Sequence, residues 1–292
     1  MKIHSKDFRV KEGEKVSLKK WPTKIKPFFK SKEESQEIHV ESVEELSRLQ
    51  NLLYAHDRYS LLIIFQAMDT AGKDGAIKHV MSGVNPQGCQ VYSFKHPSAE
   101  DLGHDFLWRA TRSLPERGKI GIFNRSYYEE VLIVKVHPEI LRGEKLPDEL
   151  AEKDIWESRY RSINGLEKHL HRSGTRIIKF FLHLSKDEQR RRLLSRLEDP
   201  KKNWKFSEDD LKERKYWKHY MNAYEDCLSA TSTDEAPWYI VPADDKQNAR
   251  LIVSHVIRDT LNKLDMSYPK LDKSRVNELK AIRKKLQAGA RT

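Results

Sequence analysis

A short apolar run that leads through a turn of small residues into a helix constrains this chain more than any other feature. Leu61 to Phe65 predict a buried strand, and residues 67–75 form the turn. Apolar residues then recur at the spacing of a helix face: Ala76, Ile77, Val80 and Met81. Such a strand, turn and helix present backbone N–H groups and a lysine, Lys73, at a helix N-terminus. This arrangement is typical of a cradle for phosphate groups.

The turn matches the P-loop pattern only in part. Ala67 stands where that pattern has its first glycine, and Asp74 stands where it has the serine or threonine that normally holds Mg²⁺. Asp69 adds a carboxylate inside the loop, which repels phosphates unless a metal bridges the two or the carboxylate positions a nucleophile. The alternative is an ordinary glycine-containing turn between a strand and a helix.

The charge balance indicates what kind of partner to expect. The 292 residues include 55 Lys and Arg against 44 Asp and Glu, a net charge of +11. This excess favours a polyanionic partner such as nucleic acid, an acidic membrane or a long phosphate chain, although a merely soluble basic protein remains the alternative. Because only Cys89 and Cys227 are present, and because no signal-peptide core or membrane-length apolar run occurs, we expect a cytoplasmic protein.

The order of the predicted elements indicates the fold class. Strands are predicted at 61–65, 90–94, 118–123, 176–184 and 238–241. Helices are predicted at 42–56, 98–114, 148–171, 185–197, 207–228 and 247–264, with another from Ser274. Their alternation predicts an α/β protein with a three-layer α/β/α P-loop kinase fold, in which a five-stranded parallel sheet is covered on both faces. We expect a basic N-terminal arm (1–40), the kinase domain (41–265) and a basic C-terminal tail (266–292).

Polar and basic side chains cluster where ligands bind in such folds. Asn124, Arg125 and Ser126 follow the third strand, and the carboxyl ends of parallel strands are the usual binding edge. Asn124 occupies the position where an acidic residue often contacts Mg²⁺. Arg109 and Arg112 are predicted to share a helix and either point together at an anion or form a solvated basic face.

A second basic cluster follows the fourth strand. Four arginines lie on the predicted helix, and a basic loop with two aromatic residues follows at 201–206: Arg190, Arg191, Arg192 and Arg196. A phosphate cradle combined with an arginine-rich helix and loop is the layout of nucleotide kinases, in which a helical lid, here about 189–212, brings arginines over the transferring phosphoryl group. Lid closure also excludes water, which competes as the acceptor.

Four motifs in this order carry a family resemblance. They are residues 68–75, residues 124–129, residues 189–200 with 203–206, and residues 236–244. Together they resemble polyphosphate kinase family 2, most closely its class III branch, over about residues 10 to 270. Members of that branch use inorganic polyphosphate to phosphorylate both AMP and ADP. Many relatives carry Asp at the position of Asn124.

The resemblance implies roles for individual residues. It implies that Lys73 and the loop backbone hold phosphates, that Asp69 binds Mg²⁺ (or Mn²⁺) or orients the acceptor, and that Asn124 lies at the metal. The expected catalytic residues are Asp69, Lys73, Arg125, Arg192 and Arg196. Glu129 and Glu130 are expected to help set which nucleotide is accepted. The full set of expected substrate-binding residues is Thr70, Ala71, Gly72, Asp74, Gly75, Lys78, Arg109, Arg112, Asn124, Ser126, Glu129, Glu130 and Lys205.

The expected function is therefore transfer of the terminal phosphoryl group of polyphosphate to ADP and AMP. The expected partners are inorganic polyphosphate and AMP, ADP and ATP, without nucleic acid or membrane, in a homo-oligomer (a dimer or tetramer). Two other readings remain open. One is an ATP-dependent nucleotide or small-molecule kinase, and the other is a non-enzymatic polyanion-binding protein with a degenerate P-loop.

Overall fold

Five parallel strands form one sheet in the order β2-β3-β1-β4-β5, in a computed structural model that describes residues 3–144, 146–151 and 154–289. The strands are β1 (Ser60–Gln66), β2 (Cys89–Ser93), β3 (Ile120–Asn124), β4 (Thr175–His183) and β5 (Trp238–Pro242). Strand β1 lies at the centre of this order, so the turn that follows it is flanked by the ends of β3 and β4.

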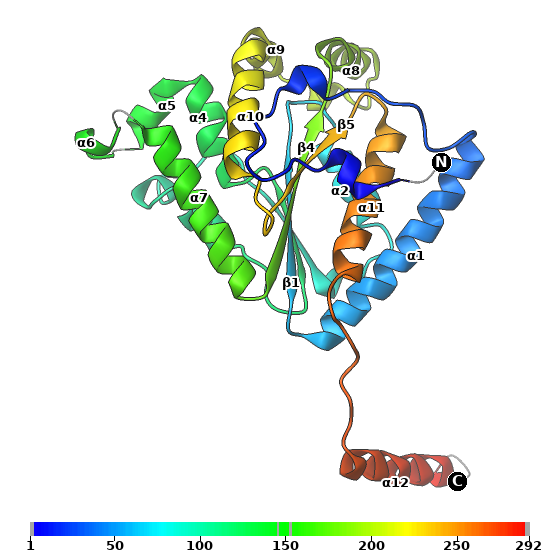
Figure 1. Ribbon diagram of the computed structural model, residues 1–292. Helices are drawn as coiled ribbons and strands as arrows, with labels where there is room; N and C mark the ends of the chain where they lie inside the picture. The colour runs from blue at the N-terminus through cyan, green and yellow to red at the C-terminus, as the bar shows by residue number, and fades with distance from the viewer. Residues whose placement is uncertain (1–2, 145, 152–153, 290–292) are drawn as a thin grey trace.

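Helices cover both faces of the sheet (Figure 1). One face packs against α1 (Lys32–His56), α2 (Lys73–Val80) and α11 (Lys246–Asn262). The other packs against η5 (Tyr127–Val131), α4 (Ile133–Val136), α7 (Ile155–Arg172) and α10 (Trp217–Thr231). Within β1, Leu61 and Ile63 join the first core and Leu62 and Ile64 the second, as the two-residue period of a strand requires. The predicted three-layer fold with a five-stranded parallel sheet is confirmed.

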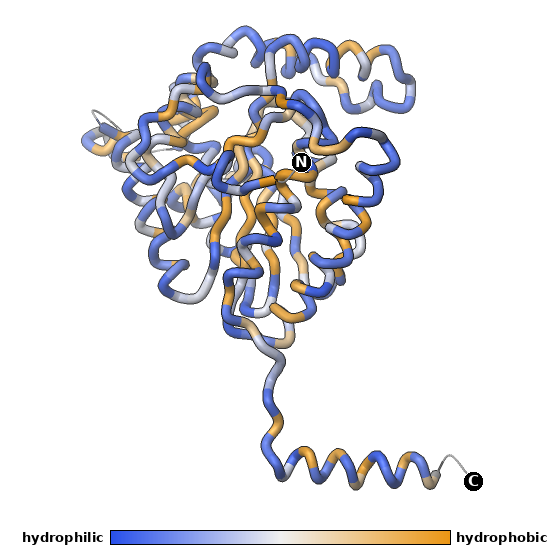
Figure 2. The backbone as a smooth tube through the Cα atoms, turned by 45° about the vertical axis from the view of Figure 1, so that its right-hand side comes forward, coloured by the Kyte–Doolittle hydropathy of each residue, from blue (hydrophilic) through white to orange (hydrophobic). Residues whose placement is uncertain are grey.

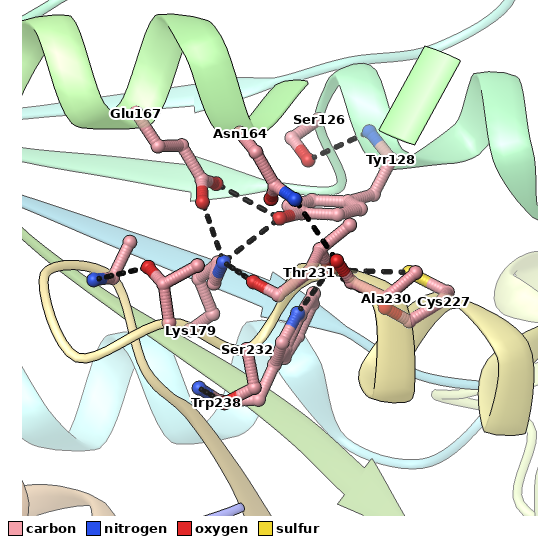
Figure 3. A network of polar contacts seen from close by, with 12 residues as sticks. Ser126, Tyr128, Asn164, Glu167, Lys179, Cys227, Ala230, Thr231, Ser232 and Trp238 are labelled. Atoms are coloured by element: carbon pink, nitrogen blue, oxygen red, sulfur yellow. Dashed lines mark hydrogen bonds and ion pairs between the residues drawn. The ribbon is translucent and has the colours of Figure 1, made fainter. Parts of the chain in front are cut away.

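A buried ion pair lies inside the second core (Figure 3). Lys179 on β4 is fully buried, and its Nζ lies 2.6 Å from a carboxylate oxygen of Glu167 on α7. The hydroxyls of Tyr127 and Tyr128 each donate to Glu167 at 2.8 Å, and Lys179 also donates to the Thr231 carbonyl at 2.7 Å. These bonds fix η5, which directly follows the end of β3.

The arginine-rich segment lies above the carboxyl ends of the strands (Figure 1). It consists of α8 (Lys186–Glu198), the 3₁₀ turn η6 (Asn203–Lys205) and α9 (Glu208–Lys215). Ser185 and Ser207 cap the two helices by accepting hydrogen bonds from Glu188 N and Asp209 N, as their positions in the sequence predict.

Several predicted helix boundaries are wrong. The helix predicted from Ser42 begins ten residues earlier, at Lys32 with Ser31 as its cap, so the capping pattern at Ser42 lies inside α1. The helix predicted at 98–114 is instead a 3₁₀ turn, η4 (Asp101–Gly103), and a short α3 (Trp108–Thr111). Asp105 accepts a hydrogen bond from Leu107 N, a local side-chain contact that competes with helix formation.

Two longer predicted helices are each divided in the structure. The segment 148–171 contains α6 (Asp148–Ala151) and α7, and residues 152–153 lie outside the described residues. The segment 207–228 is divided at Tyr216 into α9 and α10. The remaining short elements are η1 (Ser5–Phe8), η2 (Leu18–Lys20), η3 (Pro86–Gly88) and α5 (Pro138–Gly143).

The two ends of the chain differ in how they meet the core. The N-terminal segment crosses the surface beside β5, buries Phe8, Val10, Leu18 and Phe28, and donates from Val10 N to the Trp238 carbonyl at 2.9 Å. In contrast, α12 (Lys273–Gly289) projects away from the body, and apolar and polar residues alternate along it (Figure 2). Among the described helices none is both long enough and apolar enough to cross a bilayer.

Candidate functional site

The turn between β1 and α2 has the backbone of a phosphate-binding loop. Gly72 adopts a left-handed conformation (φ 102°) as the residue before α2, a conformation that glycine tolerates best. Thr70 also has a positive φ, 65°, which costs free energy in a residue with a side chain. The Thr70 hydroxyl is buried and has no hydrogen-bond partner among the described residues. Strain and an unsatisfied hydroxyl in one loop are typical of a ligand site.

Lys73 lies folded against this loop. Its side chain is buried, and Nζ donates to the Ala67 carbonyl at 2.9 Å. Burial lowers the pKa of the Lys73 ammonium to about 8, and the positive charge of Arg125 acts in the same direction. If a phosphate binds to the loop, the Lys73 ammonium can donate to it in place of the backbone carbonyls.

A cavity of about 910 Å³ opens above the loop. Ten Lys and Arg residues line it, against four acidic residues. The basic residues are Lys73, Lys95, Arg125, Arg191, Arg192, Arg196, Lys202, Lys205, Lys246 and Arg250, and the acidic ones are Asp69, Asp74, Glu188 and Asp210. A concave site with this excess of cations attracts a ligand with many negative charges.

Arg125 connects β3 to the phosphate loop. Its Nη2 lies 2.6 Å from Asp69 Oδ1, and its Nη1 lies 3.6 Å from Glu129. The carboxylates of Glu129 and then Asp69 raise the pKa of the Arg125 guanidinium, which is therefore permanently charged. Arg125 has a positive φ of 64°, and its N–H donates to the Phe65 carbonyl at 3.0 Å. The backbone thus holds the guanidinium at the mouth of the loop.

Asn124 contacts the opposite side of the loop. Its Nδ2 donates to Asp74 Oδ1 at 2.7 Å, so the amide and this carboxylate form a pair where a carboxylate at position 124 would repel Asp74. Both residues line the cavity. The two departures from the P-loop pattern are therefore in contact with each other.

The two arginines expected in the lid have different environments. Arg192 is buried and donates to the carbonyls of Ala71 (2.8 Å) and Ala243 (2.6 Å), so it joins the phosphate loop to the end of β5. Arg196 is more accessible and lies 3.0 Å from Asp210 on α9. Both line the cavity, but Arg192 acts as a fixed connection between loops and Arg196 as part of the surface above them.

Twelve of the expected site residues line this one cavity: Asp69, Thr70, Ala71, Gly72, Lys73, Asp74, Gly75, Asn124, Arg125, Arg192, Arg196 and Lys205. Six others do not: Lys78, Arg109, Arg112, Ser126, Glu129 and Glu130. Lys78 is exposed on α2, and Ser126 is buried as the cap of η5.

Of the two arrangements open for Arg109 and Arg112, convergence on an anion is not what the structure shows in the cavity, because neither side chain lines it. Arg109 lies 3.0 Å from Glu130, whereas Arg112 is exposed, 3.7 Å from Glu100. Arg109 lies in α3 and Arg112 ends it, so the two keep helical spacing, but their side chains pair with carboxylates from different segments. Burial, together with the nearby carboxylate of Glu144, raises the pKa of Glu130 to about 7. Glu130 thus belongs to a partly buried charge cluster beside the cavity.

Other cavity residues are absent from the expected site residues, although Arg191 and Lys202 lie in the predicted arginine-rich helix and basic loop. Lys246 and Arg250 lie one turn apart at the start of α11, and Arg191, Lys202 and Lys95 complete the basic lining. The carboxyl end of the predicted fifth strand was a usable signal, because the same edge rule that selected Arg125 applies to the helix after β5.

The protein offers few side chains that could coordinate a metal ion here, so phosphate oxygens of a bound substrate would have to supply most of the coordination. No group of three or more His, Cys, Asp or Glu side chains that could hold a metal occurs among the described residues. The cavity does contain the carboxylates of Asp69 and Asp74 and the amide of Asn124. Such a sparse set fits Mg²⁺, which typically binds one or two carboxylates, several waters and substrate phosphates.

Comparison with known proteins gives consistent matches. Residues 29–269 match the family model for polyphosphate kinase 2. The chain is 64% identical to the ADP-polyphosphate phosphotransferase of Rhodopseudomonas palustris, over 98% of this chain and 99% of that protein. It is 42% identical to the AMP/ADP-polyphosphate phosphotransferase of Meiothermus ruber, over 90% of this chain and 95% of that protein. The crystal structure of polyphosphate kinase 2 from Arthrobacter aurescens superposes with a TM-score of 0.85 at 39% identity, over 95% and 96% of the two chains.

Proposed function

The chain belongs to the polyphosphate kinase 2 family, and we propose that it transfers the terminal phosphoryl group of inorganic polyphosphate to ADP and to AMP. In this reaction a nucleotide phosphate oxygen forms a bond to the terminal phosphorus. The bridging P–O bond of the chain breaks, and its electron pair stays on the shortened polyphosphate. The products are ATP from ADP and ADP from AMP, and the reaction is reversible.

The observation that carries this proposal is the cavity itself. It joins a phosphate loop to ten Lys and Arg side chains within one space of about 910 Å³. Phosphoryl transfer depends mainly on positioning and on stabilising the charge of the equatorial oxygens. A nucleotide alone carries few phosphates, whereas a chain of phosphates can use cations along the whole lining.

The contacts support distinct roles on the two sides of the loop. Arg125, from the end of β3, is proposed to contact the phosphates of the acceptor nucleotide. Lys246 and Arg250, from the start of α11, are proposed to bind the donor chain on the other side. Lys73 and the loop N–H groups lie between them and are proposed to hold the phosphoryl group that is transferred. An acceptor phosphate oxygen is already ionised near neutral pH, so the reaction requires no strong general base.

We propose that Mg²⁺ (or Mn²⁺) supports the reaction by neutralising phosphate charge. Asp69 and Asp74 would supply the carboxylates, and Asn124 would hold Asp74 in place through their 2.7 Å hydrogen bond. Isothermal titration of Mg²⁺ in the presence of a non-hydrolysable nucleotide tests this role. Asp69→Asn should weaken metal binding, and unchanged affinity would contradict the assignment.

The choice of acceptor is the finer part of the proposal. The relative from R. palustris is named for ADP alone, whereas that from M. ruber is named for AMP and ADP. We propose that this chain accepts both, because the relative named for both acceptors matches 90% of this chain at 42% identity. Initial rates with AMP and with ADP, each with polyphosphate as the donor, test this point. ADP formation from AMP is expected, and its absence would restrict the enzyme to ADP.

The donor distinguishes this function from that of an ATP-dependent kinase. With AMP as acceptor, polyphosphate is expected to support a much higher rate than ATP. A preference for ATP would assign the chain to ordinary nucleotide kinases instead.

We further propose that the protein acts in the cytoplasm as a homo-oligomer, without nucleic acid or membrane as a partner. The partly apolar α12, which projects from the body, supports the oligomer (Figure 2). Light scattering after size-exclusion chromatography should give the mass of a dimer or tetramer, and a monomer mass would contradict it. Gel-shift and vesicle-flotation assays at physiological salt test the absence of the other partners.

A further inference from the structure

Asp244, two residues beyond β5, connects its own turn to the N-terminal arm and to α8, two segments that are far away in the sequence. Its Oδ2 accepts a hydrogen bond from the Thr23 hydroxyl at 2.9 Å, and its backbone N–H donates to the Thr23 carbonyl at 2.9 Å. Its Oδ1 accepts from Ser185 N, the cap of α8, at 2.8 Å. Its carbonyl accepts from Arg192 at 3.2 Å, next to the stronger bond from Arg192 to Ala243.

The same segment of the N-terminal arm makes a second connection. The buried Asn248 accepts from Phe28 N at 3.0 Å and donates to the Lys26 carbonyl at 3.2 Å. Asp244 and Asn248 flank Lys246, which lines the cavity. Residues 23–28, which lie outside the cavity lining, therefore form hydrogen bonds on both sides of the turn between β5 and α11.

Neither Thr23 nor Asp244 belongs to the cavity lining. The family model begins at residue 29, so Thr23 and Lys26 also lie outside the segment that it matches. Their hydrogen bonds connect to the cavity through Arg192, the start of α8 and the turn that carries Lys246. An effect of Thr23 on the reaction is transmitted through these neighbours.

We propose that the N-terminal arm is a positioning element for phosphoryl transfer, which acts from Thr23 through Asp244 on Arg192 and on the start of α8. Arg192 in turn contacts the Ala71 carbonyl of the phosphate loop at 2.8 Å. Displacement of a positioning group by about 1 Å can reduce a rate by roughly 100-fold. This inference rests on the proposed phosphotransferase function, although its test separates the two.

The test compares kcat and KM of the full-length protein for the wild type, Thr23→Val, Thr23→Ser and Ser17→Ala, with ADP as acceptor and polyphosphate as donor. Thr23→Val keeps the shape but removes the hydroxyl, and Thr23→Ser restores it. Ser17 is a matched control in the same arm, because its side chain makes no capping hydrogen bond. We expect Thr23→Val to lower kcat about five- to tenfold with an unchanged KM for ADP, and the other two variants to match the wild type.

A double-variant comparison excludes a purely structural effect. In an Arg192→Lys background, Thr23→Val should lower kcat by less than twofold, because the group through which it acts is already altered. An equal loss in both backgrounds would overturn the proposal, and so would a Thr23→Val protein with wild-type kcat or one that fails to fold. If the wild type forms no ATP from polyphosphate, the proposed function itself fails, which is a different result.

Discussion

Asn124 Nδ2 lies 2.7 Å from Asp74 Oδ1, so the residue at the end of β3 is hydrogen-bonded to the first turn of α2. A neutral amide at position 124 allows the Asp74 carboxylate to lie at the phosphate loop without a second negative charge against it. The site around the phosphate loop therefore combines an acidic residue in the first turn of α2, Asp74, with a neutral residue at the end of β3, Asn124.

Replacement of Asn124 by Asp should make the free protein less stable and more dependent on metal. Two carboxylates about 4 Å apart repel by roughly 1 kcal/mol in water and by more at a partly buried site. We expect the midpoint of thermal unfolding to fall by roughly 2–4 °C in EDTA and to recover with Mg²⁺. Asn124→Ala, which adds no charge, should show no such recovery. Equal midpoints of Asn124→Asp in EDTA and in Mg²⁺ would contradict this account.

Polyphosphate binding should take up protons in mildly alkaline solution. Because the pKa of Lys73 is about 8, much of this side chain is neutral at pH 8.5. A bound polyanion favours the ammonium form, so Lys73 gains a proton on binding. Calorimetric titrations at pH 8.5 in two buffers of different ionisation enthalpy should report this uptake, which should be smaller at pH 7. Lys73→Met should abolish the difference, and its persistence would assign the proton to another group.

The same pKa has a consequence for stability. An unfolded lysine keeps its ordinary pKa of about 10.4, so between pH 8 and 10.4 the unfolded state binds more protons than the folded state does. From this group alone, the free energy of unfolding rises with pH in that window. Urea titrations of the wild type and Lys73→Met at pH 8 and pH 10 test the sign, because the free energy of unfolding of the wild type should rise relative to that of Lys73→Met at the higher pH.

The basic residues at the start of α11 should affect the donor but not the acceptor. Lys246→Ala combined with Arg250→Ala removes two charges from the cavity lining. We expect the KM for polyphosphate to rise about tenfold or more, since a hydrogen bond to a charged group contributes about 1.5–3 kcal/mol. The KM for ADP should stay within twofold. Lys78→Ala is the matched control, because Lys78 is exposed on α2 outside the cavity. A parallel rise in both KM values would contradict separate binding regions.

The buried ion pair of Lys179 and Glu167 should stabilise the fold only when both charges are present. Glu167→Gln leaves the ammonium, fully buried and 2.6 Å from position 167, without a counter-ion. Loss of one partner from a buried pair costs about 3–5 kcal/mol. Adding Lys179→Met to Glu167→Gln should restore part of the loss. Chemical denaturation measures all three variants, and a double variant less stable than Glu167→Gln would argue against the explanation.

The sheet was predictable because its signals are local. Most of the strands are apolar runs bounded by turns, β2 being a half-exposed edge strand, and the near-continuous run of β4 correctly indicated burial on both faces. The loop around Lys73 could be predicted equally well, because its residues are adjacent in the sequence. The expected site residues that line the cavity lie in this loop, at the end of β3, on the arginine-rich helix or, for Lys205, in the η6 turn that follows that helix.

The errors come from contacts that the sequence does not display. Whether Arg109 faces a ligand or Glu130 depends on a pairing across 21 residues. Arg192 lies on the predicted arginine-rich helix, but the sequence does not display its hydrogen bonds to carbonyls 121 and 51 positions away. Helix boundaries failed at Ser42 because a good capping pattern can also lie inside a helix when the surrounding residues pack against the core.

The central claim is that the loop around Lys73 transfers phosphoryl groups from polyphosphate to a nucleotide. The most direct test is the initial rate of ATP formation from ADP and Mg²⁺, with polyphosphate as the only donor, for the wild type and Lys73→Ala. We predict steady ATP formation by the wild type and a rate lowered at least roughly 10²-fold in Lys73→Ala, the size of loss typical when a group that stabilises transition-state charge is removed. Circular dichroism should be unchanged. Absence of ATP with the wild type, or full activity of Lys73→Ala, would contradict the account.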